Sequence, residues 1–265
     1  MLDALSPQRR RLVLVLIGLV GLLVLALAVT LVVRLTRPTA APVPQDRPGP
    51  VLLVPGYGGR VESLDPLAAA LRAAGRDVRV VPRLGDGTGD LDAEAERLAE
   101  VADQTLAETG APSVDAIGYS AGGVVVRLWV RDHGGDGRAR RVLTLGSPHH
   151  GTSQAALGRE LAGGCPTACE QLVPDSDLLR RLNAGDETPD GPLWATIRSR
   201  GDQVVTPVDS AALDGAVNIL VQDVCPAADV SHGELPGTPV TLAALDAVLG
   251  ADAPAPLPRL PSCDG

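Results

Sequence analysis

A serine in the segment 114–126 has the sequence surroundings of a catalytic nucleophile. Ser120 stands in the pattern Gly-x-Ser-x-Gly, which spans Gly118–Gly122, after a short apolar run and before a helix-forming one. In a strand–turn–helix connection, this pattern places the serine on a strained turn that exposes its hydroxyl above the sheet. The glycines are expected where neighbouring backbone leaves no space for a Cβ atom. The predicted chemistry is nucleophilic attack by Ser120, with the first turn of the helix offering N–H groups to an oxyanion.

A serine needs a histidine to accept its proton and an acid to orient that histidine. His133 is predicted at the far end of the helix after the serine, and His149 and His150 follow a strand in the motif Gly146–Thr152. His232 lies in a loop after the last predicted strand. Where the order along the chain is serine, acid, histidine, only His232 leaves room for an acid before it. We therefore predict His232 as the base.

The acid is expected directly after the strand that precedes the histidine loop. Asp202 occupies that place in the run Arg198–Pro207, and the small apolar residues after it would bury it against the sheet. We predict Asp202 as the acid, with Asp209 and Asp214 as alternatives.

A glycine-rich loop, Pro55–Gly59, follows the first predicted strand and should emerge beside Ser120. Its small residues allow a backbone N–H to reach a substrate carbonyl oxygen, and the residue best placed for this is Tyr57. The N–H of Ala121, next to the nucleophile, is the expected second donor of an oxyanion hole. The Lys-Ser or Lys-Thr pair of a phosphate-binding loop does not follow these glycines.

Alternating strand and helix patterns must position these residues. Strands are predicted at 51–54, 77–82, 114–119, 141–145, 193–198 and 217–221, and helices at 65–75, 91–109, 121–133 and 239–250. Repeated strand–helix units predict an α/β fold with a mainly parallel, doubly wound sheet whose carboxyl edge carries the site. The interruption at 151–192 contains a short amphipathic helix at 175–182 and could cover the site as a lid.

Together these motifs resemble the bacterial class 2 lipase/esterase group of the α/β-hydrolase superfamily. The resemblance rests on Pro55–Gly59, Gly118–Gly123, Leu145–Thr152, Gly201–Val205 and Ser231-His232, which follow one another in the family's order within 51–250. It implies an α/β-hydrolase fold and carboxylic-ester hydrolysis with Ser120, Asp202 and His232 as the triad. It also implies that Gly146–Thr152 buttresses the site. Many relatives have a histidine where this chain has Pro55.

Composition limits the other functions. The chain has 265 residues and a formal net charge of -9, and its arginines are dispersed, so nucleic-acid binding has no support. We expect a monomer that acts on an ester or lipid without a cofactor or a metal ion. An acyltransferase that uses the same triad stays open, and so does a non-catalytic protein on this fold.

An uncharged apolar run at 12–33 follows three arginines at 9–11. At about 1.5 Å per residue, a helix over this run would be roughly 33 Å long, enough to cross a bilayer. We therefore expect a cytoplasmic tail and signal anchor at 1–35, an extended and unpacked proline-rich linker at 36–50, the hydrolase domain at 51–250 and a tail at 251–265. A signal peptide cleaved within 38–42 is the alternative.

Cys165, Cys169, Cys225 and Cys263 form an even set in a chain with an export signal. Two disulfides are expected, most simply Cys165–Cys169 within the interruption and Cys225–Cys263 tying the tail to the last strand. The sequence leaves the two other connectivities open. A zinc site from the first two cysteines and one of the histidines at 149–150 is the rival interpretation. Disulfides indicate an extracytoplasmic protein, either membrane-anchored or secreted.

Overall fold

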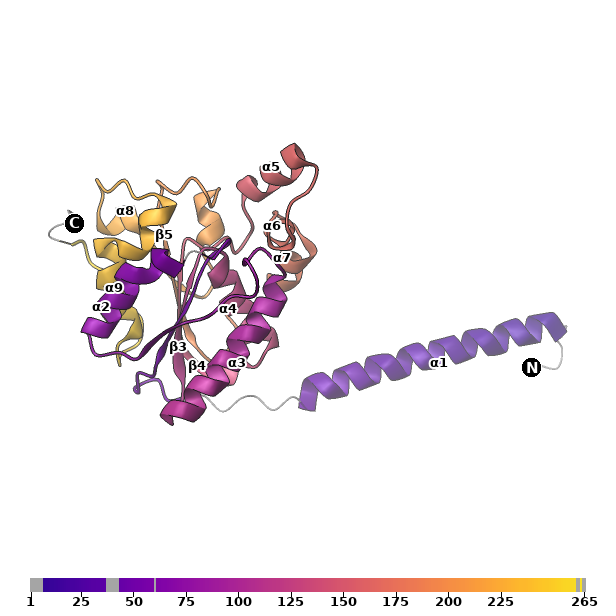
Figure 1. The fold of residues 1–265 in the computed structure, drawn as a ribbon. Helices are drawn as coiled ribbons and strands as arrows, with labels where there is room; N and C mark the ends of the chain where they lie inside the picture. Colours follow the sequence, from indigo (N-terminus) through magenta and orange to yellow (C-terminus); the bar gives the residue numbers. More distant parts are fainter. Residues whose placement is uncertain (1–6, 37–42, 60, 261–262, 264–265) are drawn as a thin grey trace. The chain divides into compact units, whose positions relative to one another are not determined.

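The computed structural model describes residues 7–36, 43–59, 61–260 and 263 (Figure 1). The chain divides into two compact units, Met1–Ala40 and Ala41–Gly265. In the first unit, Pro7–Thr36 forms the helix α1. Within the described ranges, no helix combines the length and the apolar character needed to cross a bilayer. The transmembrane helix predicted over 12–33 is therefore not supported.

The second unit is built on a parallel sheet with the strand order β2-β1-β3-β4-β5-β6. The strands are β1 (Val51–Val54), β2 (Val78–Val80), β3 (Val114–Tyr119), β4 (Ala139–Leu145), β5 (Leu193–Arg198) and β6 (Val217–Leu220). The strand order reverses between β1 and β3, because the chain passes outward to β2 and then returns. In open α/β sheets, the ligand crevice lies outside the carboxyl ends of the strands at such a reversal. The loops that leave β1 and β3 there carry Tyr57 and Ser120.

Helices cover both faces of the sheet, as Figure 1 shows. One face carries α2 (Asp65–Ala73), α8 (Val221–Val224) and α9 (Pro239–Leu249), and the other carries α3 (Leu91–Thr109) and α4 (Ala121–Asp132). The 3₁₀ helices are η2 (Val61–Leu64), η3 (Gly135–Gly137), η4 (Val208–Ala211) and η5 (His232–Gly237). The prediction of a mainly parallel, doubly wound sheet is confirmed.

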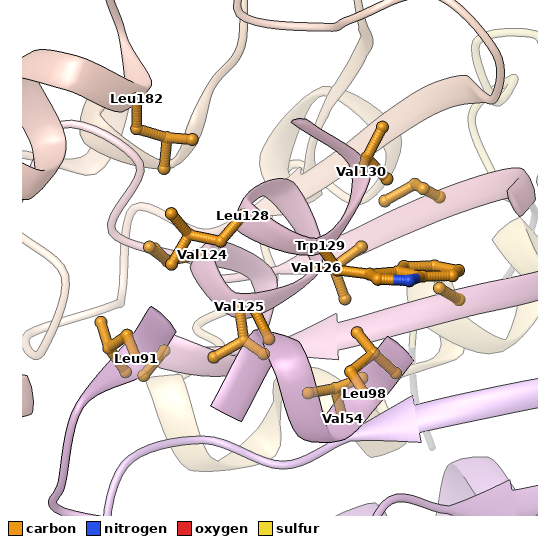
Figure 2. Close-up of a cluster of buried hydrophobic side chains, with 14 of the residues drawn as sticks. Val54, Leu91, Leu98, Val124, Val125, Val126, Leu128, Trp129, Val130 and Leu182 are labelled. Atoms are coloured by element: carbon orange, nitrogen blue, oxygen red, sulfur yellow. The ribbon is translucent and has the colours of Figure 1, made fainter. Parts of the chain in front are cut away.

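Helix α4, which begins directly after Ser120, is deeply buried. Every residue of α4 from Ala121 to Val130 is buried. Figure 2 shows its valines in one cluster with Leu91 and Leu98 of α3 and Val54 of β1. The chain has no phenylalanine, so aliphatic side chains and tryptophans fill this core. Full burial of one such aliphatic side chain contributes about 1.5–3 kcal/mol, which keeps α4 firmly in place behind the site.

Several predicted elements have the expected bounds for the expected reasons. Helix α3 begins after Asp90, whose side chain accepts the N–H of Asp92, and it ends at Gly110 in the left-handed conformation with φ 66°. The helix predicted at 65–75 is shorter. Its N-cap is Leu64, because the 3₁₀ turn η2 leads directly into it.

The interruption at 151–192 folds into α5 (Ser153–Ala162), α6 (Thr167–Gln171) and α7 (Asp177–Leu182), which Figure 1 shows on one side of the second unit. Helix α7 is the predicted short amphipathic helix and begins after the N-cap Ser176. Helices α5 and α6 were not predicted. The side chain of Thr152 accepts the N–H of Gln154 and so begins α5.

Residues 43–50 of the proline-rich segment belong to the second unit and pack within it, so the expectation of an unpacked linker was wrong there. Val43 and Pro50 are buried. The fully buried guanidinium of Arg140 pairs with Asp115 at 2.7 Å and donates to the carbonyl of Gln45 at 2.9 Å. A buried guanidinium needs acceptors for its five N–H groups. Asp115 accepts two of them, and the backbone carbonyls of Gln45, Leu249 and Gly250 accept the other three.

Candidate active site

The turn between β3 and α4 consists of Ser120 alone. Its φ of 54° and ψ of −129° form a backbone conformation that serine rarely adopts. Its N–H donates to the carbonyl of Leu145 on β4 at 2.8 Å, and its carbonyl accepts the N–H of Gly123 at 3.0 Å. The strained turn predicted from the Gly-x-Ser-x-Gly pattern is present.

The glycines on either side of this turn allow backbone to approach backbone. A Cβ atom on Gly118 would lie 2.5 Å from the Cα of Gly123, and one on Gly122 would lie 2.2 Å from the carbonyl oxygen of Val54. Any side chain at these two positions would push α4 away from β3 or β1. The predicted reason for these glycines is therefore confirmed.

Three side chains from distant parts of the sequence meet at this turn. Nε2 of His232 lies 3.0 Å from Oγ of Ser120, and Nδ1 of His232 lies 2.7 Å from Oδ2 of Asp202. Both distances suit hydrogen bonds. The side chains of His232 and Asp202 are 10% and 2% exposed, so water has little access to this pair. The structure thus brings together the residues predicted as nucleophile, base and acid.

The loop after β5 orients the carboxyl group of Asp202. Its Oδ1 accepts the backbone N–H groups of Val204 at 2.8 Å and Val205 at 2.9 Å. Because Oδ1 is occupied in this way, Oδ2 faces His232 and accepts a hydrogen bond from its Nδ1–H. Nε2 is then the acceptor nitrogen of the ring and faces the hydroxyl of Ser120.

The segment that carries His232 is held at the start of η5 and by the side chain of Tyr119. Ser231 and Glu234 form a capping box, in which the N–H of Ser231 donates to Glu234 at 2.8 Å. The hydroxyl and N–H of Ser231 lower the pKa of Glu234. The hydroxyl of Tyr119 donates to the carbonyl of His232 at 3.1 Å, and the two rings lie 5.1 Å apart. Burial, with a smaller effect of the Asp202 charge, raises the pKa of Tyr119 to about 12, so this hydroxyl keeps its proton.

The loop after β4 supports the pair of His232 and Asp202 from behind. A Cβ atom on Gly146, which has φ 52°, would lie 3.1 Å from both Nδ1 of His232 and Oδ2 of Asp202. Thr152, at the other end of this loop, donates its hydroxyl to the carbonyl of Val204 at 2.6 Å. These contacts are those of the buttress that the resemblance implies.

The loop after β1 approaches the nucleophile through Gly56, on which a Cβ atom would lie 2.8 Å from the Cβ of Ser120. The guanidinium of Arg83 donates to the carbonyl of Gly56. Because a trans peptide directs its C=O and N–H to opposite sides, the N–H of Tyr57 points away from Arg83. The N–H of Ala121 belongs to the first turn of α4, whose N–H groups have no partner within the helix. These two N–H groups are the candidate oxyanion donors.

Two hollows meet at Ser120, with Tyr57 and Val204 as their common rim. The larger one has a volume of about 570 Å³, and His232 forms part of its wall. The smaller one has a volume of about 220 Å³ and a mainly apolar wall. The residues that line only the smaller one are Pro148, Thr152, Gln154, Ala155, Cys169, Leu172 and Val205. Tyr57 and Val204 are 43% and 45% exposed, so solvent reaches the entrance of both hollows.

The other histidines lie away from the nucleophile. His133 ends α4 and its Nε2 lies 3.0 Å from Asp92. His149 is fully buried, and its Nε2 lies 3.0 Å from the hydroxyl of Thr144. Burial holds the pKa of His149 well below 6.5, so this ring is neutral. His150 faces solvent in part, with 41% of its side chain exposed.

The alternative acids and the zinc interpretation do not fit the structure. Asp209 pairs with Arg198 at 3.3 Å, and its side chain is 82% exposed. Asp214 is exposed, and its carboxyl group accepts the N–H of the neighbouring Gly215 at 3.1 Å. Within the part of the chain that the structure describes, no group of three histidine, cysteine or acidic side chains could hold a metal ion.

The four cysteines form two disulfides, Cys165–Cys169 and Cys225–Cys263. This is the simplest of the connectivities considered from the sequence. The first bridge leaves Cys165 and Cys169 without thiolates for zinc, and the second ties the tail to the residue that follows α8.

Sequence reasoning missed Arg83 and Tyr119. Arg83 contacts a carbonyl 27 residues away, and Tyr119 contacts a carbonyl 113 residues away. Tyr119 carried a usable signal. It is the last residue of β3 and directly precedes Ser120, so a side chain beside the site could have been expected there. Nothing near Arg83 in the sequence indicates its contact.

No protein-family model and no curated protein sequence matches the chain. Solved structures do match it. Lipase B from Aspergillus fumigatus has a TM-score of 0.68 and 21% identity, over 78% of this chain and 54% of the lipase. The mature lipase BlEst2 from Bacillus licheniformis has a TM-score of 0.61 and 18% identity, over 80% of this chain and 96% of that one. The chain has the α/β-hydrolase fold.

A product of the gene lin2722 from Listeria innocua shares this α/β-hydrolase fold, with a TM-score of 0.57, 14% identity and coverage of 79% of this chain and 98% of its own. The chain spans about half the length of the Aspergillus lipase. At these identities the comparisons establish the α/β-hydrolase fold, and any activity must be argued from the site.

Proposed function

We propose that the protein is a serine hydrolase that cleaves carboxylic esters through an acyl-serine intermediate. One observation carries the proposal. Oγ of Ser120, the ring of His232 and the carboxyl group of Asp202 form a hydrogen-bonded series with distances of 3.0 and 2.7 Å. Solved structures of the same fold are named as lipases, which agrees with an ester substrate.

The first half-reaction transfers the acyl group to the enzyme. Nε2 of His232 takes the proton of Ser120 while Oγ forms a bond to the ester carbonyl carbon. The carbonyl oxygen becomes an oxyanion, which the N–H groups of Tyr57 and Ala121 would receive. The carboxylate of Asp202 accepts a hydrogen bond from Nδ1–H and stabilises the imidazolium, and the proton stays on the ring. The bond to the alcohol oxygen then breaks, and Nε2 gives its proton to the departing alkoxide.

The second half-reaction returns the enzyme to its initial state. A water molecule attacks the acyl carbon while Nε2 of His232 takes one of its protons. The second oxyanion collapses, the bond to Oγ breaks, and His232 returns the proton to Ser120. The products are one carboxylic acid and one alcohol for each ester and water consumed.

The position of His232 assigns the two hollows to the two parts of the ester. The alcohol must depart on the side where Nε2 can protonate it, and His232 forms part of the wall of the larger hollow alone. The acyl chain is then directed to the smaller hollow, where Ala155, Leu172 and Val205 supply apolar wall. The larger hollow therefore takes the alcohol and the smaller one the acyl chain.

The volume of the smaller hollow favours short and medium acyl chains. Ligand pockets commonly have volumes of about 300–1,000 Å³, and this one has about 220 Å³. Each methylene group that enters it contributes about 0.8 kcal/mol, until the wall is reached. We expect the fastest turnover with acyl chains of about four to ten carbons.

The disulfides bear on the location of the protein. Bridges of this kind form and persist in oxidising compartments, and the Cys165–Cys169 and Cys225–Cys263 bridges account for all cysteines of the chain. We propose an extracytoplasmic enzyme. We also propose that it acts as a monomer, because one chain supplies the triad and both hollows.

A covalent probe tests the nucleophile. A fluorophosphonate should label Ser120 once and should not label Ser120→Ala. Hydrolysis of p-nitrophenyl esters by Ser120→Ala or His232→Ala should fall by a factor on the order of 10⁶. His133→Ala is the matched control, since His133 lies at the far end of α4, and it should keep wild-type rates. Labelling at another residue, or undiminished activity of Ser120→Ala, would refute the proposal.

A partition experiment separates hydrolysis from acyl transfer. Ser120 is only half-buried, so water reaches the acyl-serine directly. With butyrate ester and millimolar glycerol, we expect free butyrate as the main product. Transfer of most acyl groups to glycerol at that concentration would make the enzyme an acyltransferase.

A further inference from the structure

The Cys165–Cys169 disulfide lies at the edge of the smaller hollow. Cys169 forms part of the wall of that hollow, together with Ala155 of α5 and Leu172 at the end of α6, while Cys165 lies outside it. Sγ of Cys169 lies 3.9 Å from the carbonyl oxygen of Ala155. The bridge therefore joins the wall of the hollow to the segment that leads back to α5.

One end of α5 is held firmly. Thr152 caps the helix, and its hydroxyl also bonds to the carbonyl of Val204. The N–H of Ser153 donates to the carbonyl of Thr206 at 2.9 Å, and Ala155 is buried. The first turn of α5 is thus attached to the loop that carries the acid.

The other end of α5 has few attachments. Leu157 and Leu161 are 48% and 79% exposed. Arg159 and Glu170 form an ion pair at 3.8 Å with both side chains more than a third exposed, and such a pair contributes little. Sγ of Cys169 lies 4.0 Å from the point that a Cβ atom of Gly158 would occupy. In this part of α5, the half-buried cysteine is the main neighbour from α6.

Two glycines join α5 to the bridge. Gly163 and Gly164 have φ 69° and 140°, and a Cβ atom on either would meet nothing within 4 Å. Glycine has more backbone freedom than any other residue, and the N–H groups of these two donate to the carbonyl of Arg159, within α5 itself. The link between α5 and Cys165 therefore has no side chain to hinder a change of its backbone, and the bridge to Cys169 limits how far it can move.

We propose that the Cys165–Cys169 disulfide sets the upper limit on acyl-chain length by holding α5 and α6 together as the end wall of the acyl hollow. This proposal rests on the proposed ester hydrolysis and adds a determinant of its specificity. Cys169 contacts the acyl chain, and Cys165 is a positioning residue that acts through it. Without the bridge, α5 moves about its first turn and the hollow lengthens.

The expected signature is the point at which a longer acyl chain ceases to help. While a chain fits, each added methylene raises kcat/KM about fourfold, which corresponds to about 0.8 kcal/mol. Beyond the wall, kcat/KM stops rising. We call the acyl-chain length at which this happens the break. A wall that recedes by two methylene groups would raise the ratio of kcat/KM for a long ester to that for acetate by about 16-fold.

The test compares single cysteine variants of the full chain on p-nitrophenyl esters from acetate to laurate. In Cys165→Ser, the break should move by at least two carbons, with kcat/KM for acetate unchanged within twofold. Cys225→Ser is the matched control, because it opens the other disulfide, and its break should stay at the wild-type chain length. An unchanged break in Cys165→Ser would overturn the proposal.

Reduction of the wild-type protein supplies a second measurement if Cys165→Ser does not fold. A water-soluble phosphine gives two electrons to the bridge, protons from water complete two thiols, and the phosphine becomes its oxide. Cys225 is buried but its partner Cys263 is half-buried, like Cys165 and Cys169, so alkylation mapping must identify the reduced bridge, and the profile is measured on protein in which Cys165 and Cys169 alone are alkylated. A break that moves on this reduction supports the proposal, and one that does not move contradicts it.

The two proposals fail in different ways. If fluorophosphonate labels Ser120 and acetate esters are cleaved, the proposed function stands whatever the chain-length profile shows. Leu172→Ala, which widens the same wall, should move the break regardless of the disulfide. If Leu172→Ala moves it and Cys165→Ser does not, the bridge has no role in specificity. If no variant cleaves any ester, the proposed function has failed.

Discussion

Replacement of Asp202 by asparagine should remove activity without removing stability. The two N–H groups of Val204 and Val205 bind Oδ1, and the amide oxygen of asparagine can accept both. Its NH₂ group must then face Nδ1 of His232, which becomes an acceptor. The ring proton moves to Nε2 and points at Ser120, so the histidine can no longer take the serine proton. We expect kcat to fall by about 10⁴, which is about 5 kcal/mol of transition-state stabilisation.

The assay is steady-state hydrolysis of p-nitrophenyl butyrate, paired with thermal unfolding of the same samples. Asp202→Asn should keep a melting temperature close to that of the wild type, because its backbone contacts survive. Asp202→Ala should unfold more easily, since it leaves the buried N–H of Val205 without an acceptor at a cost of about 1–3 kcal/mol and also frees the part-buried N–H of Val204. Asp209→Asn is the matched control and should keep its activity. If Asp202→Asn retains more than a tenth of wild-type kcat, the orientation argument is wrong.

Three further predictions concern residues outside the triad. Arg83→Met frees the loop carbonyl that positions the oxyanion donor, so kcat should fall by up to about 10² with KM little changed. Asp115→Ala leaves the buried guanidinium of Arg140 unpaired, so urea denaturation should show a free energy of unfolding lower by about 3–5 kcal/mol. The control is Arg97→Ala, which removes an exposed ion pair with Glu100 and should lower that free energy by under about 1 kcal/mol. The pKa of His149 is held well below 6.5 by burial, so the unfolded chain binds one more proton in acid. Stability should therefore fall below pH 6.5 by up to about 1.4 kcal/mol per pH unit relative to His149→Gln.

The ends of an element were predictable where a local sequence signal marks them. Asp90 and Gly110 mark the bounds of α3, and Thr238-Pro239 marks the start of α9. The edge strand β2 was predicted too long, at 77–82, because an apolar run continues past the last residue that pairs with β1. The pairing with β1 ends at Leu53 and Val80, one residue before the end of β1, and a single sequence does not show where two neighbouring strands part.

The helices between 151 and 182 were only partly predictable. Helix α7 has the leucine spacing of an amphipathic helix. Helix α5 leaves Leu157 and Leu161 exposed, so its apolar residues do not trace one buried face. Helix α6 is a single turn that begins directly after Pro166 and contains one of the bridged cysteines. Neither has the periodicity on which a prediction from sequence depends.

That Ser120, Asp202 and His232 meet could be predicted because each lies directly after a strand or in a loop at one edge of the sheet, and chain order limits the choice. The contacts of Arg83 and Arg140 could not be. Arg83 beside the site and Arg140 away from it donate to backbone carbonyls of remote segments, and a carbonyl has no sequence signature. Such contacts depend on how the chain folds back on itself, which a motif does not specify.

The geometry of the nucleophile follows from the whole sheet as much as from its own pentapeptide. A non-glycine residue with the backbone of Ser120 costs about 1–3 kcal/mol and persists only where its surroundings leave no alternative. Here the N–H of Ser120 is bound to Leu145 of β4, and the glycines at 118 and 122 let β1, β3 and α4 close around it. On an exposed loop, the same pentapeptide would relax to an ordinary conformation and direct the hydroxyl into water. The reversal of strand order between β1 and β3 places it instead where the loops that carry Tyr57 and His232 meet.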